Sequence, residues 1–396
     1  MPVSLQATTE TPLLISVMFT LDDEGGHIYK QNITVGRSAE RIGWGSAGWA
    51  RAAARIRTIP PNWKLNLGSR HIRHSGLPGQ IAKLLAFLRT QIVRLSQLRS
   101  TESRPVILYA DWFDLVHLVI MTVSLYLTRL PKDLHFWFTY RTPTTPRRAI
   151  PYRILHFLIE LRLGSHRLQL LGDSELVDDS NARSFRKDFF TMPIVTTNQL
   201  TSASQVLLDE IESALPKTKK RLWWPGRPFP RKGEAVIDAI MMVPSESAQN
   251  AAMLTSERHA VPRTSIMSHV AVPDPLTPAE FSAWMHAADV ILLPYDASLH
   301  GKQGSGIFVE SAAAGRMALV TDETWMAHQY RRYGYPEFII DWTRPDLLGH
   351  ILSIASDAEH QQRSREFCRR FSRFHSEDSF AAHLQELWQK VRRSEG

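Results

Sequence analysis

Ala288-Asp-Val-Ile-Leu-Leu-Pro-Tyr-Asp296, and after it Gly304-Ser-Gly-Ile-Phe-Val-Glu310, decide the fold of this chain. The apolar run predicts a buried strand that ends at Pro294, and a helical pattern begins at about Ile307. Glycines in the loop between them let the backbone approach a phosphate, and the free N–H groups at a helix start favour negative charge. Glu310, one turn into the helix, is then placed to bind hydroxyls such as a ribose diol. An ordinary strand–loop–helix with a glycine turn explains this pattern equally well.

A second stretch, Trp224-Pro-Gly-Arg-Pro-Phe-Pro-Arg-Lys-Gly233, follows another predicted strand, Arg221 to Trp224. Cations in a rigid glycine and proline loop suit a diphosphate, because a guanidinium binds it through two hydrogen bonds and an ammonium acts as a point charge. Arg227 and Lys232 are therefore candidates for a diphosphate site, with Gly226 giving the loop its turn. A solvated basic turn between domains is the alternative.

Taken together, these two stretches resemble the retaining nucleotide-sugar glycosyltransferases of the GT-B fold. The resemblance covers about residues 221–321 well, and it is weaker at Gly25-Gly26-His27, which is similar to the N-terminal glycine loop of that family. It implies that Arg227 and Lys232 bind the donor diphosphate and also act in catalysis. It further implies that Gly226 and the loop Gly304-Ser305-Gly306 contact the donor, that Glu310 holds the ribose, and that Gly26 belongs to the donor site.

The chain departs from the family pattern near the transferred sugar. Lys302 stands where the family usually has a glutamate, and the histidines common after the third or fourth N-terminal strand are not evident. We find no Asp-x-Asp at a strand end and no His/Cys cluster, so we expect no metal and no cofactor, the nucleotide-sugar being a co-substrate. Positive groups then stabilise the leaving group.

The N-terminal half alternates apolar runs with helical patterns, which predicts βα units and a parallel sheet. We expect an α/β chain of two Rossmann-like, doubly wound domains facing a cleft, as in GT-B. The expected domains are an acceptor domain, 1–200, and a donor domain, 201–375, with a final helix, 376–396, crossing back to the first. Two N-terminal residues are candidate catalytic groups: His27 at a helix start and Asp111 after a strand, although each also fits a structural role, Asp111 as a helix cap.

The composition of the chain indicates which classes of partner suit it. The chain has 396 residues, a net charge of +8 and a pI near 9.6. Ten basic residues and no carboxylate lie between Arg51 and Ser100, which suits an anionic partner. The helix expected from Ile81 to Leu98 either lies on a membrane surface or packs on its own sheet. The single cysteine fits a reducing cytoplasm, which is the expected location of the protein. The basic segment would allow peripheral attachment to the inner face of a membrane.

The expected activity is transfer of a hexosyl group from a nucleoside diphosphate sugar to a hydroxyl of a glycan or lipid-linked acceptor, with retention and without a metal. A nucleotide-sugar epimerase or hydrolase is the first alternative. The second is a non-catalytic binder of an anionic surface or nucleic acid. Against nucleic acid, no helix-turn-helix, zinc finger or aromatic-basic RNA motif is present, and we expect no such partner.

Overall fold

The computed structural model describes residues 11–21, 27–51, 56, 59–67, 77–195, 200–242, 246–265 and 267–395. The chain forms two compact units: unit 1 is Met1–Met192 with Glu377–Gly396, and unit 2 is Pro193–Ser376. From the sequence, the predicted boundary lies after residue 200, and the polar segment 198–220 is also predicted to connect the domains. Most of that segment is instead a helix of unit 2, α6 (Ser202–Ala214), which packs against α8 (Pro278–Ala287).

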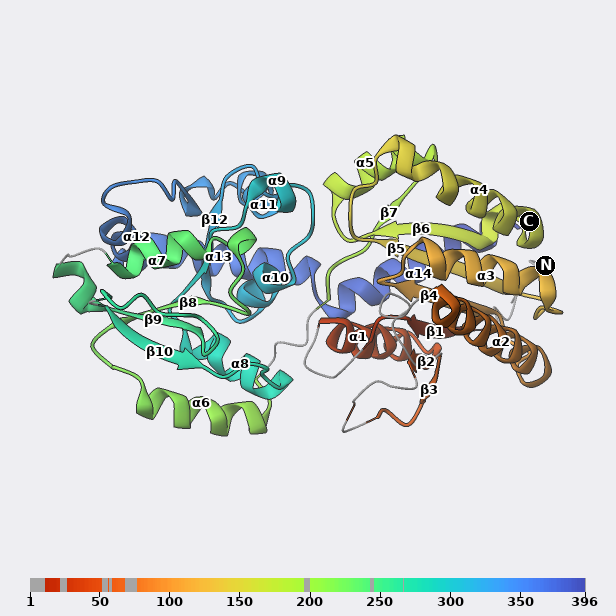
Figure 1. Ribbon diagram of the computed structural model, residues 1–396, viewed down its shortest axis with the longest axis horizontal. Coiled ribbons are helices and arrows are strands. Elements are labelled where there is room, and N and C mark those ends of the chain that lie inside the picture. Colours follow the sequence, from red (N-terminus) through yellow and green to blue (C-terminus); the bar gives the residue numbers. More distant parts are fainter. Residues whose placement is uncertain are drawn as a thin grey trace, which may run out of the picture. The chain divides into compact units, whose positions relative to one another are not determined.

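Unit 1 contains a parallel sheet of seven strands in the order β3-β2-β1-β4-β5-β6-β7 (Figure 1). Its strands are β1 (Leu13–Met18), β2 (Gly45–Arg51), β3 (Trp63–Leu67), β4 (Val106–Asp111), β5 (Leu134–Tyr140), β6 (Leu168–Gly172) and β7 (Phe190–Thr191). Its helices are α1 (His27–Arg41), α2 (Leu77–Thr101), α3 (Leu115–Leu127), α4 (Pro146–Leu163), α5 (Glu175–Phe185) and α14 (Glu377–Arg393).

Unit 2 repeats this plan with six parallel strands in the order β10-β9-β8-β11-β12-β13. Its strands are β8 (Lys220–Trp224), β9 (Ala251–Ser256), β10 (Ser268–Val272), β11 (Val290–Leu293), β12 (Met317–Thr321) and β13 (Ile339–Ile340). Besides α6 and α8, its α-helices are α7 (Glu234–Met242), α9 (Ala297–His300), α10 (Gly306–Ala313), α11 (Trp325–Tyr333), α12 (Leu347–Ser356) and α13 (Ala358–Phe374).

The strand order confirms the predicted fold class, two Rossmann-like α/β domains. In chain order within each unit, the sheet of unit 2 runs 3-2-1-4-5-6, and that of unit 1 runs in the same order with a seventh strand added at the end. This is the classic doubly wound arrangement. The central strands are short apolar runs, and Val106–Asp111 and Leu134–Tyr140 are buried at every position because helices cover both sheet faces. In such a sheet ligands bind at the carboxyl edge where the strand order reverses. That point lies between β1 and β4 in unit 1 and between β8 and β11 in unit 2.

Some predicted elements were wrong. The sequence also predicts a strand at Thr264–Ser268, whereas the structure has β10 at Ser268–Val272. Strands β2 and β9 are not predicted from the sequence. The sequence of β2, Gly-Ser-Ala-Gly-Trp-Ala-Arg, has no long apolar run, and it becomes a strand because β1 and β3 pair with it on both sides. Tertiary pairing thus overrides weak strand propensity here.

The last helix, α14, is part of unit 1 and packs against α1. It buries Phe380, Leu384, Leu387 and Trp388, and the indole of Trp388 contacts that of Trp44 edge to face, with ring centroids 6.1 Å apart. Within the part of the chain that the structure describes, no helix has both the length and the apolar character needed to cross a membrane.

Candidate active site

The two stretches singled out in the sequence follow neighbouring strands of unit 2. Strand β8 pairs directly with β11, in the register Leu222 with Val290 and Trp223 with Ile291. Because the two strands are parallel, the loop after β8 and the loop after β11 leave the same edge of the sheet. The fold therefore brings the Arg227–Lys232 loop and the Gly304–Gly306 loop to the switch point of unit 2.

The two loops touch through backbone atoms. The amide of Asp296 donates a hydrogen bond to the carbonyl of Arg231, 3.0 Å away. Gly233, with a φ of +82°, packs so closely on the end of β11 that a Cβ there would lie 2.2 Å from the carbonyl oxygen of Pro294. Only glycine fits a backbone that is both left-handed and this close to another strand. On the other side of the loop, the indole N–H of buried Trp224 donates to the carbonyl of Lys232 at 3.0 Å.

Lys232 points its ammonium at the turn made by Gly226. A Cβ on Gly226, whose φ is +84°, would lie 3.0 Å from Lys232 Nζ. Burial lowers the pKa of Lys232 from its ordinary value, and the Asp274 carboxylate opposes that shift. Among the described residues, none places a carboxylate within ion-pair distance of this ammonium. The site therefore holds a partly desolvated cation beside a backbone turn without a side chain.

Arg227 extends from the same loop and is 54% exposed. Its Nε lies 3.4 Å from Oδ2 of Asp274, and Nε of Arg258 lies 3.0 Å from the same oxygen. One carboxylate thus faces two guanidinium groups, so the local charge stays positive. Arg227 is the exposed partner of this pair and shares the Asp274 oxygen with Arg258, so an incoming anion can compete for it. The sequence analysis missed Asp274 and Arg258, and the only signal for Asp274 is its position just after a strand.

The helix after β11 offers its amino end to the same region. Ser305 is the N-cap of α10, with its hydroxyl accepting from the Phe308 amide at 3.3 Å, and Gly306 is the first helical residue. Gly304 precedes them in the loop. Glu310 lies in the second turn of α10 and is only 4% exposed. The structure therefore places the predicted donor-site residues of unit 2 on two adjoining segments. One is the loop with Gly226, Arg227 and Lys232, and the other is the loop and helix start with Gly304, Ser305, Gly306 and Glu310.

In unit 1 the corresponding edge carries a buried ion-pair cluster. Asp111 at the end of β4 accepts two hydrogen bonds of 2.7 Å from the guanidinium of Arg141, which follows β5. Arg141 also binds Asp173, which follows β6. Burial raises the pKa of Asp173 to about 6, and Arg141 opposes that shift. The sequence analysis proposed Asp111 as a base or a cap, whereas both of its oxygens are held by Arg141. This cluster was not predicted from the sequence, although Asp111 ends a strand and Arg141 and Asp173 each directly follow one.

The two remaining N-terminal candidates are less well defined. Gly26 lies outside the described residues. His27 is the first residue of α1, and its side chain lies outside the part that the structure describes. The loop after β1 does approach the end of β4, because the Thr20 hydroxyl donates to the carbonyl of Trp112 at 3.2 Å. The roles suggested for Gly26, His27 and Asp111 stay predictions.

One group of possible metal ligands occurs among the described residues: Asp133, His135 and Glu395 of unit 1. Asp133 is hydrogen-bonded to His135 at 2.7 Å and to Arg392 at 2.9 Å. The guanidinium of Arg392 therefore competes for the Asp133 carboxylate that a metal would need. The group lies at the amino end of β5, at the sheet edge opposite the switch point.

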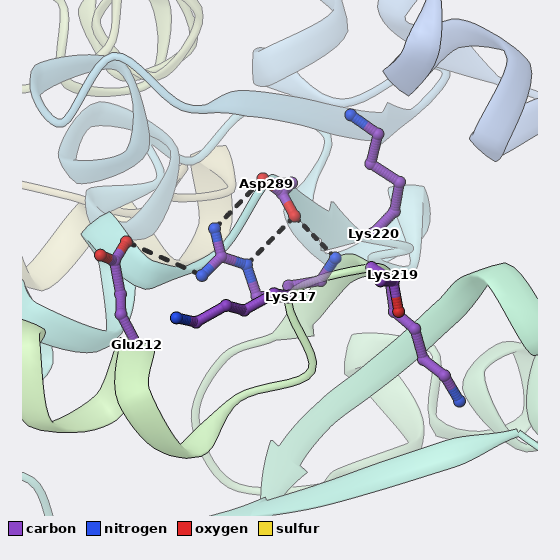
Figure 2. Close-up of a pocket in the computed structure, with 7 residues that line it drawn as sticks. Glu212, Lys217, Lys219, Lys220 and Asp289 are labelled. Carbon is purple, nitrogen blue, oxygen red and sulfur yellow. Dashed lines mark hydrogen bonds and ion pairs between the residues drawn. The ribbon is translucent and has the colours of Figure 1, made fainter.

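A polar cavity of about 370 Å³ opens at the amino end of β8, opposite the two loops (Figure 2). Lys217, Lys219 and Lys220 line it together with Glu212 and Asp289. Arg221, also in its lining, is paired with both carboxylates, at 3.2 Å from Asp289 and 3.7 Å from Glu212. These lysines are thus in the same unit as the candidate site but at the wrong edge of the sheet to serve it.

No protein-family model and no curated protein sequence matches this chain. Its structure is similar to several solved ones. A glycosyltransferase from Rickettsia africae is 10% identical, with a TM-score of 0.65 over 96% of this chain and 98% of that one. Sucrose-phosphate synthase from Thermosynechococcus elongatus is 12% identical, with a TM-score of 0.62 over 97% of this chain and all of that one.

A third similar structure contains a bound UDP-sugar derivative. It is the trehalose-6-phosphate protein from E. coli bound with UDP-2-fluoro glucose, 11% identical, with a TM-score of 0.61 over 95% of this chain and 98% of that one. At these identities the likeness establishes architecture, and it extends over nearly the whole of each chain. Together with the two doubly wound sheets, it identifies the fold of this chain as the GT-B fold of the glycosyltransferases.

Proposed function

We propose that this chain transfers a hexosyl group from a nucleoside diphosphate sugar to a hydroxyl of a glycan or lipid-linked acceptor. The observation that carries the proposal is the meeting of two cations, a glycine turn and a helix amino end at the switch point of unit 2. The fold adds support, because it is shared with glycosyltransferases, one of them bound with a UDP-sugar analogue.

The donor diphosphate would lie between the Gly226 turn and the amino end of α10. Lys232 would meet it as a buried point charge, and Arg227 would leave Asp274 to form paired hydrogen bonds to phosphate oxygens. The backbone at Gly304 and Gly306 and the hydroxyl of Ser305 would contact phosphate and sugar. Glu310, in the next turn, would accept hydrogen bonds from the ribose hydroxyls.

When the glycosidic bond breaks, negative charge grows on the departing diphosphate. Preorganised positive groups lower the barrier most when they face that charge in a partly desolvated site. Lys232 is both positive and partly desolvated, since it is half-buried and no described carboxylate lies within ion-pair distance of its ammonium. We propose that Lys232 and Arg227 supply the leaving-group stabilisation without a metal, and that the sugar keeps its anomeric configuration, as the family resemblance implies.

Unit 1 would bind the acceptor, with His27 and Asp111 as the first residues to test. We propose a cytoplasmic protein whose acceptor is reached at an anionic membrane surface, since ten cations and no carboxylate lie between Arg51 and Ser100. Not all of them serve this purpose: Arg51 is buried within β2, whereas Arg89 and Arg99 on α2 are exposed.

Thermal-shift measurement against UDP-, GDP-, ADP- and dTDP-sugars tests the donor class, because a ligand that binds only the folded state raises Tm. The stabilising donor is then incubated with candidate glycan and lipid acceptors, and nucleoside diphosphate release is measured. Acceptor-dependent release supports transfer. Release or epimerisation of donor without an acceptor would favour a hydrolase or epimerase, and no shift with any donor would reject the proposed site.

A further inference from the structure

Helices α3 and α4 carry an apolar surface in addition to the one they bury. Their inner sides pack into the unit 1 core through residues such as Leu118, Leu125 and Ile159. Their outer sides carry nine large apolar side chains that are 36% to 68% exposed, here called the α3–α4 apolar face: Val116, Val119, Val123, Tyr126, Leu127, Ile150, Ile154, Phe157 and Leu161. Monomeric proteins rarely leave so many apolar side chains uncovered in one place.

The face is continuous across the two helices. Figure 1 shows α3 and α4 side by side, with α2 next to α3. The Tyr126 hydroxyl donates to the carbonyl of Leu158 at 2.8 Å, which joins the exposed side of α3 to α4. On α4 the exposed residues recur at intervals of four, three and four positions, so they form one stripe along the helix.

A basic cavity of about 790 Å³ adjoins the carboxyl-terminal end of this face. Its cationic lining residues come from the ends of α2 and α4 and from the segments that follow α2 and α3: Arg99, Arg104, Arg129, Lys132 and Arg162. Leu127, the last residue of α3, lies two positions from Arg129, and Leu161 lies next to Arg162. The apolar face and the basic cavity therefore share a border.

Two carboxylates also line this cavity, Glu102 and Asp133, and Asp133 is bound by Arg392, which lies outside the lining. Much of the positive charge in the cavity is therefore uncompensated. Glu102 is bound by Arg104 through hydrogen bonds of 2.8 and 2.9 Å, and that contact lowers the pKa of Glu102. Arg162 caps the end of α3 by donating to the carbonyls of Leu125 and Thr128. Within the described residues, no carboxylate lies at ion-pair distance from Arg99, Arg129 or Lys132.

We propose that the α3–α4 apolar face and the basic cavity dock this chain on an anionic phospholipid bilayer. The acyl region takes the apolar side chains, while lipid phosphates enter the cavity and meet Arg99, Arg129 and Lys132. The amino end of α4 carries two more exposed cations, Arg147 and Arg148, so positive charge borders the face at both ends. In a dimer formed through this face, these cations would lie opposite the same cations of the second copy and repel them. An anionic bilayer complements both the apolar face and the positive charge.

This inference rests on the membrane attachment in the proposed function and assigns it to a surface of unit 1. Its test uses no donor or acceptor, so it can fail while the transfer reaction stands. The full chain is sedimented with vesicles of phosphatidylcholine alone and of phosphatidylcholine mixed with phosphatidylglycerol, at low and high salt. We expect binding to the anionic vesicles, partly retained at high salt through the apolar contacts. Replacing Arg99, Arg129 and Lys132 together by Gln should lower the partition coefficient by about 10²-fold, or about fivefold for each charge.

Ile154→Ser combined with Leu161→Ser tests the apolar part and should abolish the binding that survives high salt. Val206→Ser is the matched control, because Val206 is 59% exposed on α6 in unit 2. Circular dichroism and Tm confirm that each variant folds. The proposal is overturned if anionic vesicles do not bind, if neutral ones bind equally, or if the Val206 variant loses as much. A concentration-dependent dimer that dissociates in the Leu161 variant would assign the face to a second copy instead.

Discussion

Removing the Lys232 ammonium gives the sharpest test of the candidate donor site. A unit charge about 4 Å from a phosphate oxygen is worth about 4 kcal/mol at an effective dielectric constant of about 20. Lys232 is half-buried, so screening leaves roughly 3 kcal/mol, which corresponds to about 10²-fold in rate. Lys232→Ala should therefore lower kcat/KM by about 10²-fold and leave the fold intact.

Arg227 should matter less than Lys232, because it is 54% exposed and Arg258 stands beside it on the same carboxylate. We expect Arg227→Ala to lower kcat/KM by about 10-fold, with a larger share in KM because Arg258 partly replaces the lost charge. This order of the two effects follows from burial, since both residues belong to the same loop.

The assay measures nucleoside diphosphate release over a range of donor concentrations for each variant. Lys217→Ala is the matched control, because this lysine lines the cavity at the opposite edge of the same sheet (Figure 2). Normal kcat/KM in Lys232→Ala, with Tm unchanged, would refute the reasoning. So would an equal loss in the Lys217 variant, because the effect would then reflect net charge rather than position.

The pH profile provides an independent check on Lys232. Burial lowers its pKa and Asp274 opposes that shift, and the active form is the cation, which is present below the pKa. Asp274→Asn removes the opposing carboxylate, so the pKa should fall further. The loss of activity on the alkaline side should then begin at a lower pH than in the unmodified chain, and a profile that does not move would contradict this assignment.

Three further outcomes are expected. Glu310→Gln should weaken nucleotide binding by about 1–3 kcal/mol in calorimetry, and unchanged affinity would remove Glu310 from the site. Gly233→Ala should lower both Tm and donor affinity, because the new Cβ would clash with Pro294. The control is Gly315→Ala, which has a φ of +68° and no atom within 4 Å of the new Cβ, so it should cost only about 1–2 kcal/mol of backbone strain. Equal effects of the two substitutions would count against the contact between Gly233 and Pro294. Burial raises the pKa of Asp178 from 3.8 to about 7, so its contribution to stability is full below pH 4 and is lost as the pH rises to 7. Asp178→Asn should flatten Tm across that window, and an unchanged Tm profile would exclude this residue as its source.

The sequence by itself determined the fold class and the segments that carry the candidate donor site. Apolar runs such as Val290–Leu293 predict strands because burial on both sheet faces requires continuous apolar residues. The glycines of the two loops are local signals too, since Gly226 and Gly233 both have a positive φ that other residues adopt only at a cost. Chain order and local chemistry were therefore enough to place Arg227 and Lys232 in a loop after one strand and Glu310 on the helix that follows another.

Only the tertiary structure decided which strand ends are neighbours and which charges meet. The pairing of β8 with β11 brings together loops about 70 residues apart in the chain, and it shows that Lys232 is partly buried while Arg227 shares Asp274 with Arg258. The Asp111–Arg141–Asp173 cluster arises in the same way, from three strands that are adjacent only in the sheet. Long-range contacts of this kind depend on strand order and burial, which local patterns do not encode. The same is true of the α3–α4 apolar face: its periodicity predicts helices, but only packing reveals which apolar side stays uncovered.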